Sequence, residues 1–231
     1  MIVELPISKS IANRLLILQA MHGAPLMEVT SLMPQDVVLL HDSLLSLNST
    51  LYTLNLNNAG TAMRFLTAYC AQLVGCEVVL DGCERMRQRP IGPLVEALRT
   101  MGADIEYVGQ EGFPPLHIRG RRLNKQPQSV DTTVSSQFAS ALELIGVPCD
   151  APASPYLTMT RTLIQNYNSS FHHSINPSFL EADWSSAAFW YEYVALYGGE
   201  ISLPNLSLDS IQGDRVVATL FEPLGVCTQE T

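Results

Sequence analysis

The chain has 231 residues and 47% of them are hydrophobic, enough to bury a large core in one domain or one and a half. A formal net charge of −9 argues against nucleic acid as the main partner. No apolar run is long enough to span a bilayer, and no secretory signal pattern opens the chain. We therefore expect a cytoplasmic protein without a membrane partner. Five scattered cysteines fit reduced thiols better than a disulfide framework or a metal site.

Charge is unevenly distributed along the chain. Residues 1–130 hold 11 Lys or Arg and 11 Asp or Glu, whereas residues 131–231 hold 2 and 11, so the cations are concentrated in the first half. Only Lys9 and Lys125 are lysines. A lysine in an anion pocket can also act as an acid or base once its pKa is lowered.

Four predicted helices begin with a polar segment ahead of an apolar run. They are residues 8–14 (SKSIANR), 58–64 (NAGTAMR), 134–138 (VSSQF) and 183–186 (DWSS). In the second, Gly60 lets the backbone approach an anion closely, and Arg64 lies one turn further along roughly the same face. Helix N-termini attract phosphate and carboxylate groups, so these segments predict anion sites; capped helices with solvated cations are the alternative.

Each polar segment is followed, after a predicted strand, by a second helix. We expect these second helices over residues 35–47, 90–101, 156–167 and 212–224, and strands over residues 76–80, 105–108 and 116–118. Residues 112–115 (GFPP) indicate a hairpin turn or loop. The sequence therefore predicts an internal repeat of helices and strands, which is typical of an α/β fold.

Two further groups of residues are candidates for ligand binding. Arg85, Arg87 and Arg89 alternate, and an extended segment would place all three on one side, ready for an anion; a solvated basic loop is the alternative. His172 and His173 are the only histidine pair, but neighbours in sequence usually point apart, so we expect no metal site there.

Six motifs, in their order and spacing, resemble one known family. They are Leu5-Pro6-x-Ser8-Lys9-Ser10 with Arg14, then Asn58-Ala59-Gly60-Thr61-Ala62-Met63-Arg64, then Arg85-Met86-x-x-Arg89-Pro90-Ile91-Gly92, then Val134-Ser135-Ser136-Gln137-Phe138, then Pro155-Tyr156, and then Gln212-Gly213-Asp214. This series is similar to that of 5-enolpyruvylshikimate-3-phosphate synthase, and it runs over nearly the whole chain.

The resemblance implies a fold. We expect an α/β (α+β) enolpyruvyl transferase-like repeat of βαβαββ units, in which residues 10–180 form a complete lower domain of three units. Residues 1–9 and 181–231 would form an incomplete part of a second domain, with the active site in the cleft between the two. Later family motifs, including an aspartate base and a Lys-Glu pair, have no counterpart before Thr231, so the chain resembles an N-terminal portion that we expect to be inactive alone.

The resemblance also implies a reaction: transfer of the enolpyruvyl group of phosphoenolpyruvate to the 5-hydroxyl of shikimate 3-phosphate, with release of phosphate, in aromatic amino acid biosynthesis. It implies no cofactor and no metal, small-molecule substrates as partners, and a monomer when the protein is full length. By motif match, Lys9 would contact both substrates and transfer protons. The other substrate-binding residues would be Ser10, Arg14, Ser135, Ser136 and Tyr156 for shikimate 3-phosphate, Gly60 and Arg89 for phosphoenolpyruvate, Asn58 to shape the turn, and Gln137 between the two ligands.

Several positions depart from the family pattern. Asn57 stands where the family usually has Gly, and Ala182 and Trp184 alter the usual Glu-Gly-Asp-Ala-Ser segment. Ala153 replaces a common substrate-binding Ser, for which Ser154 is a possible substitute.

Two alternative functions remain open at this point. The sister enolpyruvyl transferase that acts on UDP-N-acetylglucosamine uses a loop cysteine at the position of Glu84, next to Cys83 here. A non-catalytic phosphate-binding module with the same repeat is the second alternative. Whichever holds, the aromatic residues that follow Asp183 predict self-association through residues 184–231 if their apolar surface is left uncovered.

Overall fold

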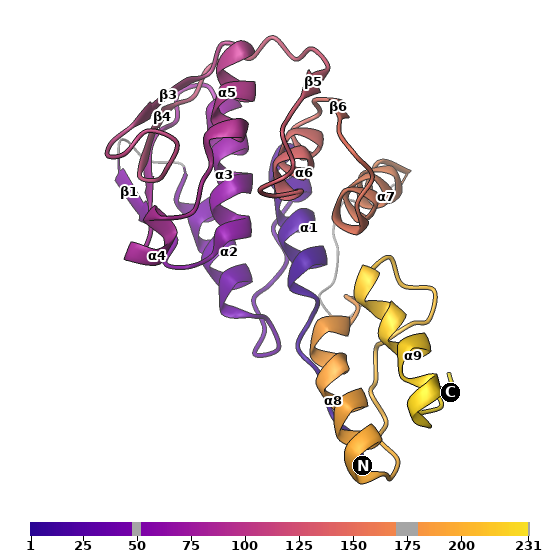
Figure 1. Cartoon of the computed structure of the whole chain (residues 1–231). Coiled ribbons are helices and arrows are strands. Elements are labelled where there is room, and N and C mark those ends of the chain that lie inside the picture. Colours follow the sequence, from indigo (N-terminus) through magenta and orange to yellow (C-terminus); the bar gives the residue numbers. More distant parts are fainter. Residues whose placement is uncertain (48–51, 170–179, 231) are drawn as a thin grey trace.

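The computed structural model describes residues 1–47, 52–169 and 180–230, in which helices and strands form a mixed α/β arrangement (Figure 1). The helices are α1 (Lys9–Met21), α2 (Gln35–Ser46), α3 (Gly60–Gln72), α4 (Glu84–Arg87), α5 (Gly92–Thr100), α6 (Gln137–Leu144), α7 (Pro155–Ser169), α8 (Trp184–Tyr197) and α9 (Val217–Leu220), with 3₁₀ turns η2 (Gly213–Val216) and η3 (Glu222–Leu224). The strands are β1 (Tyr52–Asn55), β2 (Glu77–Asp81), β3 (Asp104–Tyr107), β4 (Leu116–Arg119), β5 (Gln128–Ser129) and β6 (Cys149–Asp150). None of the helices in the described ranges is both long and apolar enough to cross a membrane.

A four-stranded sheet lies on one side of the helices (Figure 1). Its strand order is β1-β2-β4-β3, with β1 parallel to β2 and β4 antiparallel to both of its neighbours. From β1 to β4 the elements follow the order β, α, β, α, β, β, with the short α4 inserted. Val78, Leu80, Leu116 and Ile118 alternate along β2 and β4 and are fully buried on the face that α3 covers.

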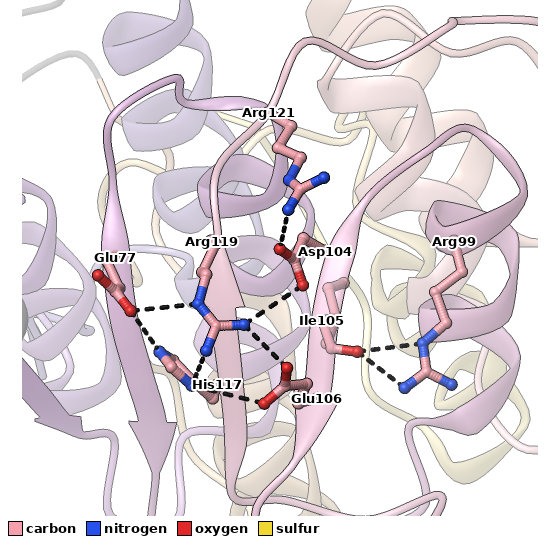
Figure 2. Close-up of polar contacts among 8 residues, drawn as sticks. All are labelled: Glu77, Arg99, Asp104, Ile105, Glu106, His117, Arg119 and Arg121. Carbon is pink, nitrogen blue, oxygen red and sulfur yellow. Dashed lines mark hydrogen bonds and ion pairs between the residues drawn. The ribbon is translucent and has the colours of Figure 1, made fainter.

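The opposite face of this sheet carries a ladder of charged side chains (Figure 2). Arg119 on β4 donates to Glu77 Oε1 on β2 at 3.2 Å and to Glu106 Oε1 on β3 at 2.9 Å. Arg121 pairs with Asp104, which also accepts from Arg119. A slip of one residue would turn these charges into the core, so the ladder and the buried face specify the same register.

Four helices, α1, α3, α6 and α7, pack against one another beside the sheet. α1 is buried over residues 11–19, including Arg14, and α3 is buried over most of its length, including Arg64. A helix that is buried on all sides belongs in the centre of a domain. The helix packing therefore places two arginines inside the protein.

Among the described residues, the buried apolar side chains form two clusters. The larger cluster runs from Ile7 to Leu180, and the smaller cluster joins Leu5 to residues between Ala182 and Val226. Residues 1–3 reach the smaller cluster by pairing with residues 200–202; for example, Val3 N donates to Ser202 O at 3.0 Å.

The chain crosses between these clusters in two segments, residues 5–8 and 180–184, and Gln212 joins these two crossing segments by hydrogen bonds. The segments run side by side, since Ser8 N donates to Glu181 O at 2.9 Å. The buried Gln212 Oε1 accepts from Ser8 Oγ at 2.8 Å and from Trp184 N at 3.2 Å, and its Nε2 donates to Ala182 O at 2.8 Å. One buried amide therefore satisfies polar groups on both segments.

The predicted helices and strands agree with the structure within a few residues, with two errors, one of which, the extended segment expected at residues 85–89, is described with the site below. The helix expected over residues 212–224 is broken into η2, α9 and η3. Pro223 lacks the N–H that a continuous α-helix would need, and Gly225 follows with a φ of 85°. β1, β5, β6 and α4 were not predicted.

Candidate functional site

The first turns of α1, α6 and α7 meet at the side chain of Arg14. Its Nη1 donates to Ser10 O at 2.8 Å, and its Nη2 donates to Gln137 Oε1 at 2.9 Å and lies 3.3 Å from Tyr156 O. The guanidinium also lies over the rings of Phe65 and Tyr156, at 5.3 Å and 5.7 Å from their centroids. Four of the predicted site residues, Ser10, Arg14, Gln137 and Tyr156, are therefore in direct contact.

The polar start of α6 lies next to this contact. Ser135 and Ser136 are half-buried, and Ser135 Oγ accepts from Gln137 N at 3.3 Å. Tyr156 is 39% exposed, so part of its ring can reach a ligand. Ser154 Oγ accepts from Leu157 N at 3.2 Å and thereby caps α7.

The start of α3 is built around the close approach of Arg89 to Gly60. A Cβ atom added to Gly60 would lie 2.2 Å from Arg89 Nη1, so only glycine leaves room for this guanidinium. Arg64 Nη1 donates to Gly60 O at 2.8 Å. The preceding turn contains the exposed Asn58 and, at Asn57, a φ of 47°, a conformation that glycine adopts easily and asparagine tolerates.

Arg64 connects the start of α3 to the start of α6, because its guanidinium lies 5.3 Å from the centroid of the Phe138 ring. The N-terminal turns of α1, α3, α6 and α7 therefore lie in one region, and their partial positive charges point to a shared site.

The arginines of this region are not neutralised by ion pairs within the part of the chain that the structure describes. No carboxylate of the described residues is ion-paired with Arg14, Arg64 or Arg89. Burial lowers the pKa of Arg14 to about 9, and burial together with the nearby Arg89 lowers the pKa of Arg64 to about 10. A bound anion would relieve both penalties, so the site is suited to an anionic ligand.

Lys9 lies at the edge of this region. Its Nζ is 3.2 Å from Asp36 Oδ2, and both side chains are partly exposed. Lys9 also lines an open hollow of about 540 Å³. The two crossing segments contribute Pro6 and Asp183 to its lining. The lining residues are Glu4, Pro6, Lys9, Ser31, Leu32, Met33, Pro34, Asp183 and Ser186.

The expectation that Arg85, Arg87 and Arg89 lie on one side of an extended segment is wrong. Residues 84–87 form α4, anchored by the buried Met86, so the alternation does not translate into a shared face. Arg87 instead pairs with Asp81 at 2.6 Å, whereas Arg89 approaches Gly60.

The polar side chains of the fourth segment, residues 183–186, make structural hydrogen bonds. Asp183 Oδ2 caps α8 by accepting from Ser186 N at 2.9 Å, and Ser185 Oγ donates to Asp214. His172 and His173 lie outside the described residues. Within the described ranges, no group of three or more His, Cys, Asp or Glu is placed to hold a metal.

Sequence reasoning missed two residues that the structure places beside the predicted ones. Thr160 and Ser140 are fully buried hydroxyls in contact with Arg14. Buried polar residues in otherwise apolar helix faces were the available signal, but that signal does not reveal their partners.

Comparison with known proteins agrees with the motif series. A family model described as EPSP synthase (3-phosphoshikimate 1-carboxyvinyltransferase) matches residues 1–231. A 3-phosphoshikimate 1-carboxyvinyltransferase from Bacteroides fragilis is 37% identical over 99% of this chain and 61% of that protein, and one from Colwellia psychrerythraea is 30% identical over 96% of this chain and 63% of that protein. The chain thus spans about three fifths of the length of these relatives.

A solved structure, the EPSP synthase from Acinetobacter baumannii, is similar in fold. It matches with a TM-score of 0.67 over 90% of this chain and 56% of that chain, at 19% sequence identity. The expected enolpyruvyl transferase fold is confirmed by this match. The family model and the two relatives together show that this chain belongs to the EPSP synthase family.

Proposed function

We propose that this chain supplies the shikimate 3-phosphate site, and part of the phosphoenolpyruvate site, of an enzyme that transfers the enolpyruvyl group between these two substrates. The observation that carries the proposal is the meeting of four helix N-termini around Arg14, Arg64 and Arg89, none of which is ion-paired to a described carboxylate. Both substrates are phosphorylated anions, which such a site favours.

The predicted residues divide into two groups in the structure. Ser10, Arg14, Gln137 and Tyr156 are in contact, with Ser135 and Ser136 beside them, which supports one site for shikimate 3-phosphate. Gly60 and Arg89 are in contact at the start of α3, which supports a neighbouring site for phosphoenolpyruvate, with Asn58 in the turn before it.

The proposed reaction is addition followed by elimination. Protonation of the methylene carbon of phosphoenolpyruvate makes its C2 atom electrophilic, and the 5-hydroxyl attacks C2 and loses its proton. The C2–O bond to phosphate then breaks and a methyl proton is lost, which leaves the enol ether. Lys9 is the residue of this chain that we assign to proton transfer, and the arginines stabilise phosphate charge as it develops.

The two apolar clusters, which separate between Leu5 and Ile7 and between Leu180 and Ala182, support a domain division close to the one that we propose, residues 10–180 for one domain and residues 1–9 with 181–231 for part of a second. We further propose that the whole protein is a cytoplasmic monomer. Its partners would be its two substrates rather than nucleic acid or membrane.

Calorimetric titration with shikimate 3-phosphate tests this function. We expect the wild-type chain to bind this ligand selectively over inorganic phosphate and UDP-N-acetylglucosamine, and Ser135→Ala to abolish binding. Ser129→Ala is the matched control, because Ser129 is an exposed serine on β5 that belongs to none of the six motifs. Preference for UDP-N-acetylglucosamine would favour the sister transferase, and equal binding of inorganic phosphate would favour a simple phosphate-binding module.

A further inference from the structure

We propose that Thr160 and Ser140 are positioning residues, whose buried hydroxyls hold the Arg14 guanidinium in the orientation that sets the shikimate 3-phosphate site. This inference rests on the proposed function. It concerns two residues that none of the six sequence motifs assigns to the site.

Thr160 is placed to fix the direction of the guanidinium. Its Oγ1 accepts from Arg14 Nε at 2.7 Å, and both side chains are fully buried. The same oxygen lies 2.7 Å from Tyr156 O and 2.9 Å from Ser140 Oγ, and its single proton can be donated to only one of them at a time. Ser140 Oγ is in turn 3.3 Å from Arg14 Nη2. The hydroxyl pair therefore restrains two of the three guanidinium nitrogens.

Every described polar partner of Arg14 is electrically neutral. The acceptors are two hydroxyls, one side-chain amide and two backbone carbonyls. A carboxylate in their place would hold the guanidinium as firmly but would cancel its charge. Because these partners are neutral, the positive charge of Arg14 stays available to an anion. The same burial desolvates the guanidinium and lowers the pKa of Arg14.

The orientation of Arg14 matters because three predicted ligand-binding residues depend on it. The guanidinium holds the Ser10 carbonyl, the Gln137 side chain and the Tyr156 carbonyl through hydrogen bonds. These residues begin three different helices. If Arg14 turned, the three helix starts would lose their common contact, so Thr160 acts on the ligand site without being placed to touch the ligand.

Three variants separate this role from a general loss of a buried hydroxyl. Thr160→Val keeps the shape and removes the acceptor, and Thr160→Ser restores the hydroxyl. Thr67→Val is the matched control: Thr67 is also fully buried in a helix, and its Oγ1 donates to Met63 O at 2.8 Å, but no hydrogen bond joins it to Arg14. Circular dichroism melting verifies that each variant folds.

The first readout needs no ligand: the Nε–H signal of Arg14 in protein with isotope-labelled arginine, assigned as the signal missing from Arg14→Lys. We expect a slowly exchanging signal in the wild type, Thr160→Ser and Thr67→Val, and fast exchange with water in Thr160→Val. The second readout is the Kd for shikimate 3-phosphate, which we expect to weaken roughly ten-fold or more in Thr160→Val and to change little in Thr160→Ser and Thr67→Val.

The outcomes distinguish this inference from the proposed function. A protected Arg14 signal in Thr160→Val, an unchanged Kd, or an equal loss in Thr67→Val would overturn the positioning role. A folded wild-type chain that binds no shikimate 3-phosphate would contradict the proposed function for this chain, while the Arg14 signal would still decide whether Thr160 restrains the guanidinium.

Discussion

Replacing Gln212 with Leu is expected to destabilise the region in which the chain crosses between its two apolar clusters. The substitution would leave Trp184 N–H and the Ala182 carbonyl buried without their partner, and each such group costs about 1–3 kcal/mol. The buried Ser8 hydroxyl would also lose its acceptor, but the leucine recovers part of the total loss through apolar burial. We therefore expect the free energy of unfolding to fall by about 2–4 kcal/mol.

Tryptophan fluorescence during urea unfolding is a suitable assay. Both tryptophans, Trp184 and Trp190, lie on α8, so their emission reports on the smaller cluster, whereas circular dichroism reports on the whole chain. The fluorescence transition of Gln212→Leu should move to lower urea than that of the wild type. A loss below about 0.5 kcal/mol would show that Gln212 does not join the two segments, and would refute the reasoning.

Gln212→Glu adds a test of the hydrogen-bond directions. A protonated carboxyl can still donate to Ala182 O, whereas a carboxylate would face that oxygen, so burial and this contact should raise the pKa of the introduced group above about 4.3. A raised carboxyl pKa means that the folded state binds more protons. The loss of stability relative to the wild type should therefore grow as the pH rises above about 4.3, whereas Gln212→Leu should show a nearly constant loss.

Three further predictions concern the site, the acid stability and the surface. Gly60→Ala should weaken phosphoenolpyruvate binding roughly ten-fold in calorimetry with little change in melting temperature, because the new methyl group displaces the mobile end of Arg89 rather than the backbone. Arg87→Ala removes the hydrogen bond that lowers the pKa of Asp81. That bond stabilises the wild type above about pH 3.9, and the stabilisation disappears as the pH falls further, so the variant should be less stable than the wild type above about pH 3.9 and approach it at lower pH. Urea unfolding at a series of pH values measures this difference. Phe189→Ser should reduce self-association in light scattering, since this residue is 72% exposed on α8.

Matched controls sharpen the first and last of these tests. Gly109→Ala adds a methyl group at an ordinary contact distance of 3.7 Å from Pro115 Cδ, so it should leave binding unchanged. Glu192→Ala alters an exposed polar position on α8 and should leave self-association unchanged. A wild-type sample that is monomeric and melts sharply would contradict the predicted self-association, and unaltered phosphoenolpyruvate binding in Gly60→Ala would contradict the role given to Arg89.

Local patterns predicted the main helices and the position of their polar starts. α1, α3 and α6 could be located from their apolar periodicity and from the hydroxyl, glycine or cationic residues in their first turns, because these signals act over one or two turns. β5 and β6, with two residues each, pair only through tertiary contact, and no local signal marks them. α4 was missed because alternating charges suggested an extended segment, whereas the buried Met86 fixes a helical turn.

The contacts that organise the site were beyond sequence reasoning for a different reason. Arg14 and Thr160 are 146 residues apart, and Ser8 and Gln212 are 204 residues apart. A motif can indicate that a residue binds an anion, but it does not identify the neutral groups that orient that residue. The resemblance to a family supplied ligand contacts, and only the packing of α1, α6 and α7 revealed the hydroxyls behind them.

During synthesis, Val3 leaves the ribosome long before Ser202, with which its backbone pairs. At roughly 5–20 residues per second, the delay is on the order of 10–40 s. The larger cluster has all its buried members between Ile7 and Leu180, so it can fold within that interval. Leu5, which belongs to the smaller cluster, must wait for residues 182–226. Leu5 is thus made long before it can be buried, and a chaperone that recognises apolar segments on nascent chains has a long opportunity to bind there.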